Sequence, residues 1–466
     1  MSLSDCRGVP CSTANRSSLD SYERAVELSA SYFVDPLAVI DSALERDPEF
    51  ASGHCLRAGL MVMAADKSVL PMLAESIAAI EALGRRANER ERAHGAAARA
   101  WMNGDFATSI RRYGEILLEY PHDLLALQIA HVGDFYLGAT SLLRDRVAQV
   151  LPLWDISIPG FHYVLGMYAF GLEETALYAR AEDVGRRAVE IQGRDVWAIH
   201  AVAHVMEMQG RLRHGIDWLT EREKDWSVDN GFAFHNWWHL ALYHLDLGDT
   251  NQVLSLYDQK IRPSRMPLEM VDASALLWRL HIRGVDVGLR WQGLADSWTP
   301  FASDGYYAFN DVHSLMAFVG AQRFDLVEKV LSGLERSAAG FGTNAMMARE
   351  VGLPVGHAVV SFALGHYAEC VDLLLPVRTQ AHRFGGSHAQ RDFIHLTLVE
   401  AALRAGKVRL ARALIAERTQ LKPASPFNWQ LAARACDSSG QASEAAEARD
   451  SAESRRKTHA DALRAQ

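Results

Sequence analysis

Apolar side chains recur along most of the chain at the three- and four-residue spacings that place them on one face of an α-helix. Between residues 107 and 120, for example, Ile110, Tyr113 and Leu117 fall on one stripe. No segment shows the sustained alternation of apolar and polar residues that is typical of a half-buried strand. We therefore predict an all-α protein with essentially no sheet. The same helical pattern covers 250–261, 325–334 and 410–421.

A turn signature recurs between the predicted helices. A glycine is followed at fixed offsets by an aromatic or aliphatic residue, a small residue and a proline. A small residue lets two helices approach closely, and glycine tolerates the left-handed backbone that ends a helix. These offsets are typical of tetratricopeptide repeats, and they predict a right-handed α-solenoid of antiparallel helical hairpins. The clearest instances are Gly104, Phe106, Ser109 and Pro121, and Gly406, Val408, Ala411 and Pro423.

The composition changes at both ends of the chain. Residues 1–20 are polar, and we expect a disordered or irregular segment there. The repeat pattern covers residues 21–441. Residues 442–466 are charged and rich in alanine, which predicts a solvated capping helix with a frayed tail.

Charge and composition narrow the class of protein. The net charge of −9 argues against a nucleic-acid partner, which would need a basic surface. No apolar run reaches the roughly 18 residues of a membrane span, and the start lacks the apolar stretch of a signal peptide, so we expect a cytoplasmic protein without a membrane partner. We expect the five cysteines to be reduced thiols. Neither a glycine-rich phosphate loop nor a GxSxG element is present.

Two pairs of histidines give the chain its candidate chemistry. His200 and His204 are four residues apart, as are His235 and His239, so each pair lies on one face of its helix. The two pairs are separated by 35 residues, which is one repeat. Equivalent positions on successive first helices of a solenoid lie side by side. We therefore expect the four imidazoles to form one cluster, called here the histidine quartet, with Glu207 one turn beyond His204.

Three interpretations of the quartet remain open from the sequence. The rings could be packed in the core without chemistry. They could line a ligand pocket in which histidine and glutamate move protons, since the imidazole pKa lies near neutrality. They could bind a divalent transition metal such as Zn, Fe, Mn or Ni, although Ala201 stands where an HExxH motif has its glutamate. A cofactor is thus either absent or a divalent transition metal.

Further polar residues follow on the neighbouring predicted helices at about one-repeat intervals. We expect several of them to share one polar channel on the concave side, because the first helices of the hairpins line that side. Trp238 and other aromatic residues of the same region are candidates for the wall of a pocket. The polar candidates are His162, Glu174, Asn236, Asp272, Asp311, His313, Gln390, Arg391 and Asp392.

These motifs together resemble the tetratricopeptide repeat protein 38 family over about residues 20–435. The resemblance rests on 161–167, 170–175, 200–208, 235–239, 271–272, 309–313, 352–354 and 385–392. The chain departs from the family pattern at His388, where the family often has Asn, and at Glu173. The resemblance implies an α-helical repeat fold and no settled reaction.

The sequence is consistent with two classes of function. The first is a scaffold whose concave groove binds a peptide or small molecule. The sequence leaves open whether the protein forms a homo-oligomer. The second is an enzyme, most plausibly a hydrolase, using acid–base or metal-assisted chemistry with Glu207 or Glu174 as base and Arg391 holding an anion. The candidate catalytic residues are Glu174, His204, Glu207, His239, Asp311 and Arg391. The candidate ligand-binding residues are His162, His200, His235, Asn236, Trp238, Asp272, His313, Gln390 and Asp392.

Overall fold

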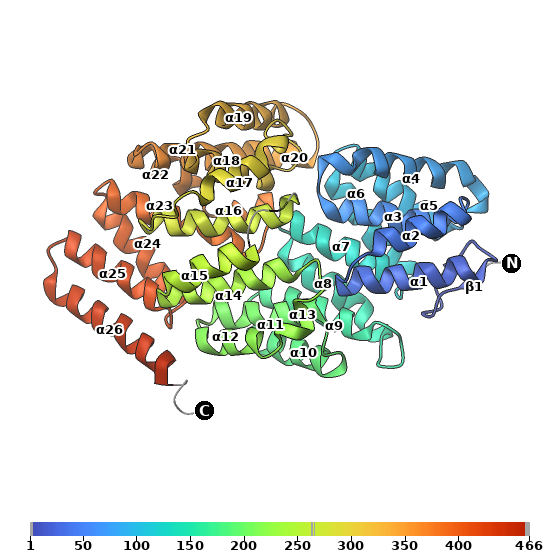
Figure 1. The fold of residues 1–466 in the computed structure, drawn as a ribbon, viewed down its shortest axis with the longest axis horizontal. Helices are drawn as coiled ribbons and strands as arrows, with labels where there is room; N and C mark the ends of the chain where they lie inside the picture. The colour runs from blue at the N-terminus through green and yellow to red at the C-terminus, as the bar shows by residue number, and fades with distance from the viewer. Residues whose placement is uncertain (1–2, 262–263, 265, 462–466) are drawn as a thin grey trace.

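The computed structural model describes residues 3–261, 264 and 266–461, which fold as a tetratricopeptide-type α-solenoid of antiparallel hairpins (Figure 1). The all-α prediction is confirmed. The first helices of the hairpins, called A helices here, are α1 (Arg16–Ser31), α3 (Ala51–Ala64), α5 (Glu89–Met102), α7 (Leu124–Tyr136), α9 (Phe161–Glu174), α11 (Val196–Met208), α14 (Ala233–Leu247), α16 (Pro267–Ile282), α18 (Ala308–Gly320), α21 (Leu353–Ala363), α23 (His388–Arg404) and α25 (Pro426–Ser438).

Each A helix is followed by a B helix that returns antiparallel to it. The B helices are α2 (Pro36–Arg46), α4 (Leu70–Leu83), α6 (Phe106–Glu119), α8 (Thr140–Val150), α10 (Tyr178–Ile191), α12 (Leu212–Thr220), α15 (Thr250–Leu256), α17 (Arg290–Trp298), α19 (Phe324–Ala338), α22 (Tyr367–Val377), α24 (Val408–Leu421) and α26 (Ala442–Asp461). The sequence pattern predicted helices in four segments, and the structure has a helix in each. Segment 107–120 corresponds to α6 and 250–261 to α15 with the π-helix η4. Segment 325–334 corresponds to α19 and 410–421 to α24.

Short elements complete the described chain. They are α13 (Glu223–Trp226) and α20 (Thr343–Met347), the 3-10 helices η1 (Lys67–Val69), η2 (Gly84–Arg86), η3 (Leu151–Leu153), η5 (Thr299–Phe301) and η7 (Ala381–Phe384), and the π-helices η4 (Tyr257–Ile261) and η6 (Ala348–Gly352). In the described part of the chain, no helix has both the length and the apolar character needed to cross a bilayer.

The N-terminal segment differs from the prediction of a disordered or irregular stretch over 1–20. Strands β1 (Leu3–Ser4) and β2 (Pro10–Cys11) pair antiparallel, and α1 already begins at Arg16. The turn between β1 and β2 is stabilised by the Asp5 carboxylate, which accepts hydrogen bonds from the backbone N–H groups of Arg7 and Val9. At the other end, α26 packs on α25, and residues 1–2 and 462–466, which include the end of the expected frayed tail, lie outside the described part.

The turns within hairpins follow the predicted chemistry. Gly210 ends the turn between α11 and α12 with φ +68°, and Gly248 ends α14 with φ +86°. Both values lie in the left-handed region, which glycine adopts without the clash that a side chain would cause. These turns bring the B helix back against its A helix within a few residues. They therefore fix the repeat length that aligns α11 with α14.

The solenoid curves until distant hairpins meet. The N-terminal helices lie at the right of Figure 1 and α24–α26 at the left, with α16–α22 above α9–α14. The residues just before α18 and the start of α20 reach the N-terminal hairpins, where the Trp101 indole N–H donates to the Tyr306 hydroxyl at 2.9 Å and Thr343 N–H donates to Gly104 O at 3.2 Å. On the inner side, α23 packs against α16 and also contacts α11. The inner face of these A helices is therefore covered by a later hairpin.

The small residues of the B helices are needed for close helix packing. A Cβ added at Gly215 in α12 would lie 2.2 Å from the ring of Tyr243 in α14. We predict that Gly215→Ala destabilises the protein by roughly 1–3 kcal/mol, because Tyr243 must move. Gly293→Ala in α17 is the matched control, since an added Cβ there meets no atom within 4 Å. Its free energy of unfolding in urea should be unchanged or raised by up to about 1 kcal/mol. Equal effects of the two substitutions would contradict this account.

Candidate functional site

The histidine quartet is a buried cluster formed by two adjacent A helices. His200 and His204 come from α11, and His235 and His239 from α14. Their side chains are at most 8% exposed. One ring nitrogen from each residue lies within 4.8 Å of a ring nitrogen from each of the others. The shared 35-residue offset therefore brings the four imidazoles together, as expected from the sequence.

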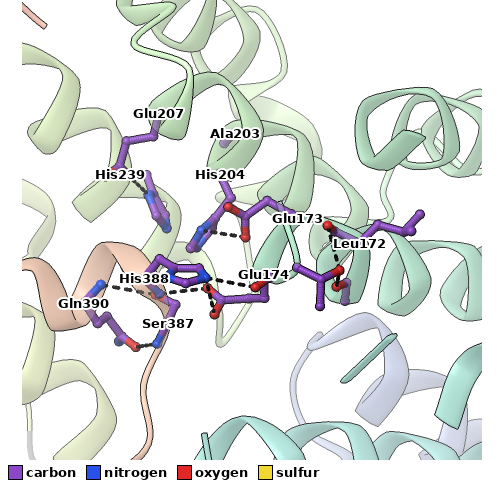
Figure 2. Close-up of polar contacts among 12 residues, drawn as sticks. Leu172, Glu173, Glu174, Ala203, His204, Glu207, His239, Ser387, His388 and Gln390 are labelled. Carbon is purple, nitrogen blue, oxygen red and sulfur yellow. Dashed lines mark hydrogen bonds and ion pairs between the residues drawn. The ribbon is translucent and has the colours of Figure 1, made fainter. Parts of the chain in front are cut away.

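Carboxylates from three helices surround the quartet, and Figure 2 shows two of them, Glu173 beside His204 and Glu207 beside His239. His235 Nδ1 lies 2.5 Å from the Asp272 carboxylate of α16, and His239 Nδ1 lies 2.9 Å from Glu207 of α11. Glu173, at the end of α9, points toward His204 with 3.5 Å between carboxylate and Nδ1. An acceptor at Nδ1 fixes the orientation of an imidazole and determines which nitrogen carries the proton. The carboxylates thus hold His235 and His239 with their Nε2 atoms facing each other, 3.2 Å apart.

Other polar atoms at the cluster make no hydrogen bond to the described part of the chain, although Glu173 and His204 lie 3.5 Å apart. Both ring nitrogens of His200 lack a hydrogen bond within the described part of the chain, as do both ring nitrogens of His204 and both carboxylate oxygens of Glu173. A buried polar group without a partner costs about 1–3 kcal/mol. Such groups therefore indicate a place that takes up water, an ion or a ligand.

Burial controls the charge of the cluster. It lowers the pKa of His204 to about 4 and the pKa values of His200 and His239 well below 6.5, and neighbouring imidazoles lower the last two further. Burial also raises the pKa of Glu173, with the nearby Glu174 adding to the effect. His200, His204 and His239 are therefore neutral near pH 7. A neutral imidazole has one nitrogen lone pair, which can accept a proton or bind a metal.

An apolar pocket leads to the quartet. The cavity has a volume of about 320 Å³, and His200, His204 and His235 form part of its lining together with Ser387 and Gln390. Val34 and Met266 also line it and are more than half exposed, so the pocket opens to the surface there. The remaining wall is mainly apolar, and its aromatic part comes from Tyr32, Phe33, Phe135, Tyr136, Phe170, Trp197, Phe232 and Phe234.

Several predicted residues lie at or next to this site. Gln390 donates to the Asp272 carboxylate at 3.2 Å, and Trp238 stacks on His235 with ring centroids 5.3 Å apart. Glu174 lies beneath His204, where one of its oxygens accepts the His388 backbone N–H at 2.8 Å and the other lies 3.5 Å from Arg391 Nη2. Asn236 is buried in α14 with no partner for its amide atoms among the described residues.

Four predicted residues lie apart from the pocket, so the expected single channel does not include them. His162 binds Asp195, which also caps α11. Asp392 forms an ion pair with Arg418 and lines a separate polar cavity of about 470 Å³. His313 bonds to Phe309 O. Asp311 lines a small cavity near Lys67 and Asp304.

Sequence reasoning missed most of the pocket wall. Phe135 and Phe170 are separated by 35 residues, and Glu173 precedes Glu207 by 34, so the repeat offset that identified the quartet extends to them. Tyr32 and Phe33 follow α1 and reach the site only through the curvature of the solenoid. Nothing in the local sequence around Tyr32 indicates that contact.

The similarities of this chain to known proteins are distant. No family model matches the chain. A human IFIT1 dimer with PPP-AAAA is 10% identical over 93% of this chain and 88% of that one, with a TM-score of 0.36. Human IFIT1 with m7Gppp-AAAA is 10% identical over 94% and 90%, with a TM-score of 0.38. Yeast Tom70 is 13% identical over 92% and 90%, with a TM-score of 0.30. At these values the similarities carry no conclusion about ligand or partner.

The separate position of Asp311 has a testable consequence for stability. Burial, and next the Asp304 carboxylate, raise the pKa of Asp311 to about 8 from 3.8. The folded state then keeps a proton that the unfolded state releases above about pH 4. The contribution of Asp311 to stability is therefore full below pH 4 and is lost as the pH rises toward 8, by at most about 1.4 kcal/mol per pH unit.

We predict that Asp311→Asn, which mimics the protonated form, flattens this decline and makes the protein more stable than wild type at pH 8. The measurement is the free energy of unfolding in urea from pH 5 to 8. Asp325→Asn is the control, because Asp325 is exposed on α19 and its carboxylate pairs with the side chain of Arg323. Parallel profiles for wild type and Asp311→Asn would exclude a protonated Asp311.

Proposed function

We propose that the protein binds one small, mainly apolar molecule in the aromatic pocket, with the histidine quartet and its carboxylates recognising the polar end of that molecule. The observation that carries the proposal is the pocket itself, whose apolar wall ends at ring nitrogens without protein partners. Its volume of about 320 Å³ is at the lower end of the range for small-molecule sites, about 300–1,000 Å³.

Enclosure favours a small molecule over a peptide. A peptide in a tetratricopeptide groove needs a continuous open concave surface. Here α23 packs against α16 and contacts α11, and the quartet is almost fully buried. A ligand reaching the quartet must therefore pass through the pocket mouth near Val34 and Met266. The solenoid acts in this proposal as a container for the ligand.

Membership of the tetratricopeptide repeat protein 38 family is part of the proposal. Several of the residues that carry that resemblance are far apart in the sequence but meet around the pocket. Glu174, Asp272 and Gln390, for example, come from α9, α16 and α23 and lie next to the quartet or bond to its carboxylates. This convergence supports a shared binding site for the family's motifs.

An enzyme with its active site at the pocket floor is the second candidate. Two imidazoles that are each oriented by a carboxylate, His235 by Asp272 and His239 by Glu207, have the arrangement used for proton transfer. Incubating wild-type protein and a His204→Ala/His239→Ala variant with a metabolite extract, followed by mass spectrometry, tests this candidate. A metabolite consumed only by the wild type would support catalysis, and identical profiles would leave binding alone.

Pocket occupancy can be measured with a neutral apolar fluorophore. We expect N-phenyl-1-naphthylamine to bind the wild type saturably at about one molecule per chain. Ala64→Phe places a ring in the pocket, which Ala64 lines, and should weaken binding by at least about tenfold, or about 1.4 kcal/mol. Fluorescence titration gives the dissociation constants.

Ala78→Phe is the matched control for this experiment, because Ala78 is exposed on α4 and does not line the pocket. It should bind the fluorophore as the wild type does. Saturable binding that is insensitive to Ala64→Phe would place the fluorophore elsewhere and would contradict the proposed pocket. Absence of saturable binding to folded wild type would contradict it as well.

A further inference from the structure

We propose that the histidine quartet binds one divalent transition-metal ion, with Zn²⁺ as the reference ion, and that Asp272 and Glu207 orient two of the ligands. The proposal rests on the geometry of the four rings, their unpartnered nitrogens and the surrounding carboxylates. It does not depend on the proposed apolar ligand, since the four imidazoles are present whether or not the pocket is occupied.

The distances between the ring nitrogens suit a metal ion. His235 Nε2 and His239 Nε2 lie 3.2 Å apart. With metal–nitrogen bonds of about 2.0–2.1 Å, adjacent ligands of a tetrahedral or octahedral ion are about 3.0–3.4 Å apart, and opposite octahedral ligands about 4.2 Å apart. The four ligand atoms, all within 4.8 Å of one another, therefore need only a small contraction to bind a common ion.

The protonation pattern leaves two lone pairs facing each other. Nδ1 of His235 bonds to Asp272 and Nδ1 of His239 bonds to Glu207. A carboxylate accepts a hydrogen bond, so the proton of each neutral ring is on Nδ1 and the lone pair is on Nε2. Two lone pairs at 3.2 Å repel, so this contact needs either a proton shared between the two rings or a metal cation bound by both. Histidine ligands with a carboxylate at the second nitrogen are typical of protein metal sites.

The other two members of the quartet complete the set. His200 and His204 are at most 1% exposed, and none of their ring nitrogens has a hydrogen-bond partner among the described residues. Coordination of one nitrogen from each ring would supply the missing interaction. Glu207 and Asp272 carry negative charge next to the rings, which favours a cation at their centre.

The ligand set determines the class of metal. Four neutral imidazoles suit Zn, Cu, Fe and Ni ions, whereas Mg²⁺ and Ca²⁺ prefer oxygen ligands. His200, His204 and His235 also line the pocket. A bound ion would therefore lie next to the pocket, where an additional coordination position could take a polar group of a ligand.

The first test uses the full-length wild-type protein. The protein is stripped with a chelator, reloaded with Zn²⁺, desalted and assayed by elemental mass spectrometry. We expect about one equivalent per chain, and X-ray absorption should show imidazole nitrogens at about 2.0–2.1 Å. Less than about 0.1 equivalent in folded protein after loading with Zn²⁺, Fe²⁺, Ni²⁺ or Cu²⁺ would overturn the proposal, as would an oxygen-only coordination shell.

The second test locates the ion. His204→Gln combined with His239→Gln should reduce the bound metal to less than about 0.1 equivalent. His131→Gln is the matched control, because His131 is also buried with both ring nitrogens unpartnered, yet it packs against Phe170 and Trp197 and is not part of the quartet. It should keep about one equivalent. Metal retained by the folded double variant, or lost equally from His131→Gln, would overturn the assignment.

A milder variant keeps the test valid if the double variant fails to fold. Asp272→Asn leaves all four imidazoles in place but removes the charge at His235 Nδ1, so the affinity for Zn²⁺ should fall by about 10- to 100-fold. Asp195→Asn is its control, since it changes the equivalent pair with His162 and Asn caps α11 equally well. Equal affinities for the two variants would contradict the role of Asp272.

The metal site and the apolar pocket can fail separately. Ala64→Phe obstructs the pocket without touching the quartet, so it should keep its metal while losing the fluorophore. A protein that binds Zn²⁺ but not the fluorophore would support the metal site and contradict the proposed ligand. A protein that binds the fluorophore but no metal would overturn the metal site alone.

Discussion

The burial of four imidazoles among carboxylates is the constraint on which the rest of this structure depends. Polar groups removed from water must find partners inside the protein, at a cost of about 1–3 kcal/mol for each one that does not. Here Asp272 and Glu207 satisfy one nitrogen each of His235 and His239. The positions of α11, α14 and α16 are therefore coupled through these contacts as well as through apolar packing.

Closure of the solenoid turns this cluster into an internal site. Tetratricopeptide hairpins stack with a constant small rotation, and a long enough array returns on itself. In this chain α23 comes back beside α16 and contacts α11, while the region around Tyr306 and Thr343 meets the hairpins near Trp101 and Gly104. The same curvature brings residues that follow α1 to the pocket wall. A surface that would be an open groove in a short array is thus a pocket, which opens near Val34 and Met266.

The pocket combines two environments that are normally separate. Its wall is aromatic, which favours an apolar ligand, and its floor holds neutral imidazoles whose lone pairs are available. Low polarity around the floor strengthens any electrostatic contact made there, because water does not compete for it. Binding of a small molecule and coordination of an ion are therefore mutually compatible at this site, and each would place a reactive group where solvent is excluded.

The sequence by itself determined the helical repeat and the pairing of the histidines, because both are properties of spacing. A 35-residue offset fixes how His200 lies relative to His235, since adjacent hairpins repeat the same geometry. Tertiary structure decided which distant elements join them. Small rotations between hairpins add up over the array, so no local pattern shows that Tyr32 and Gln390 reach the pocket whereas Asp311 and His162 lie apart from it.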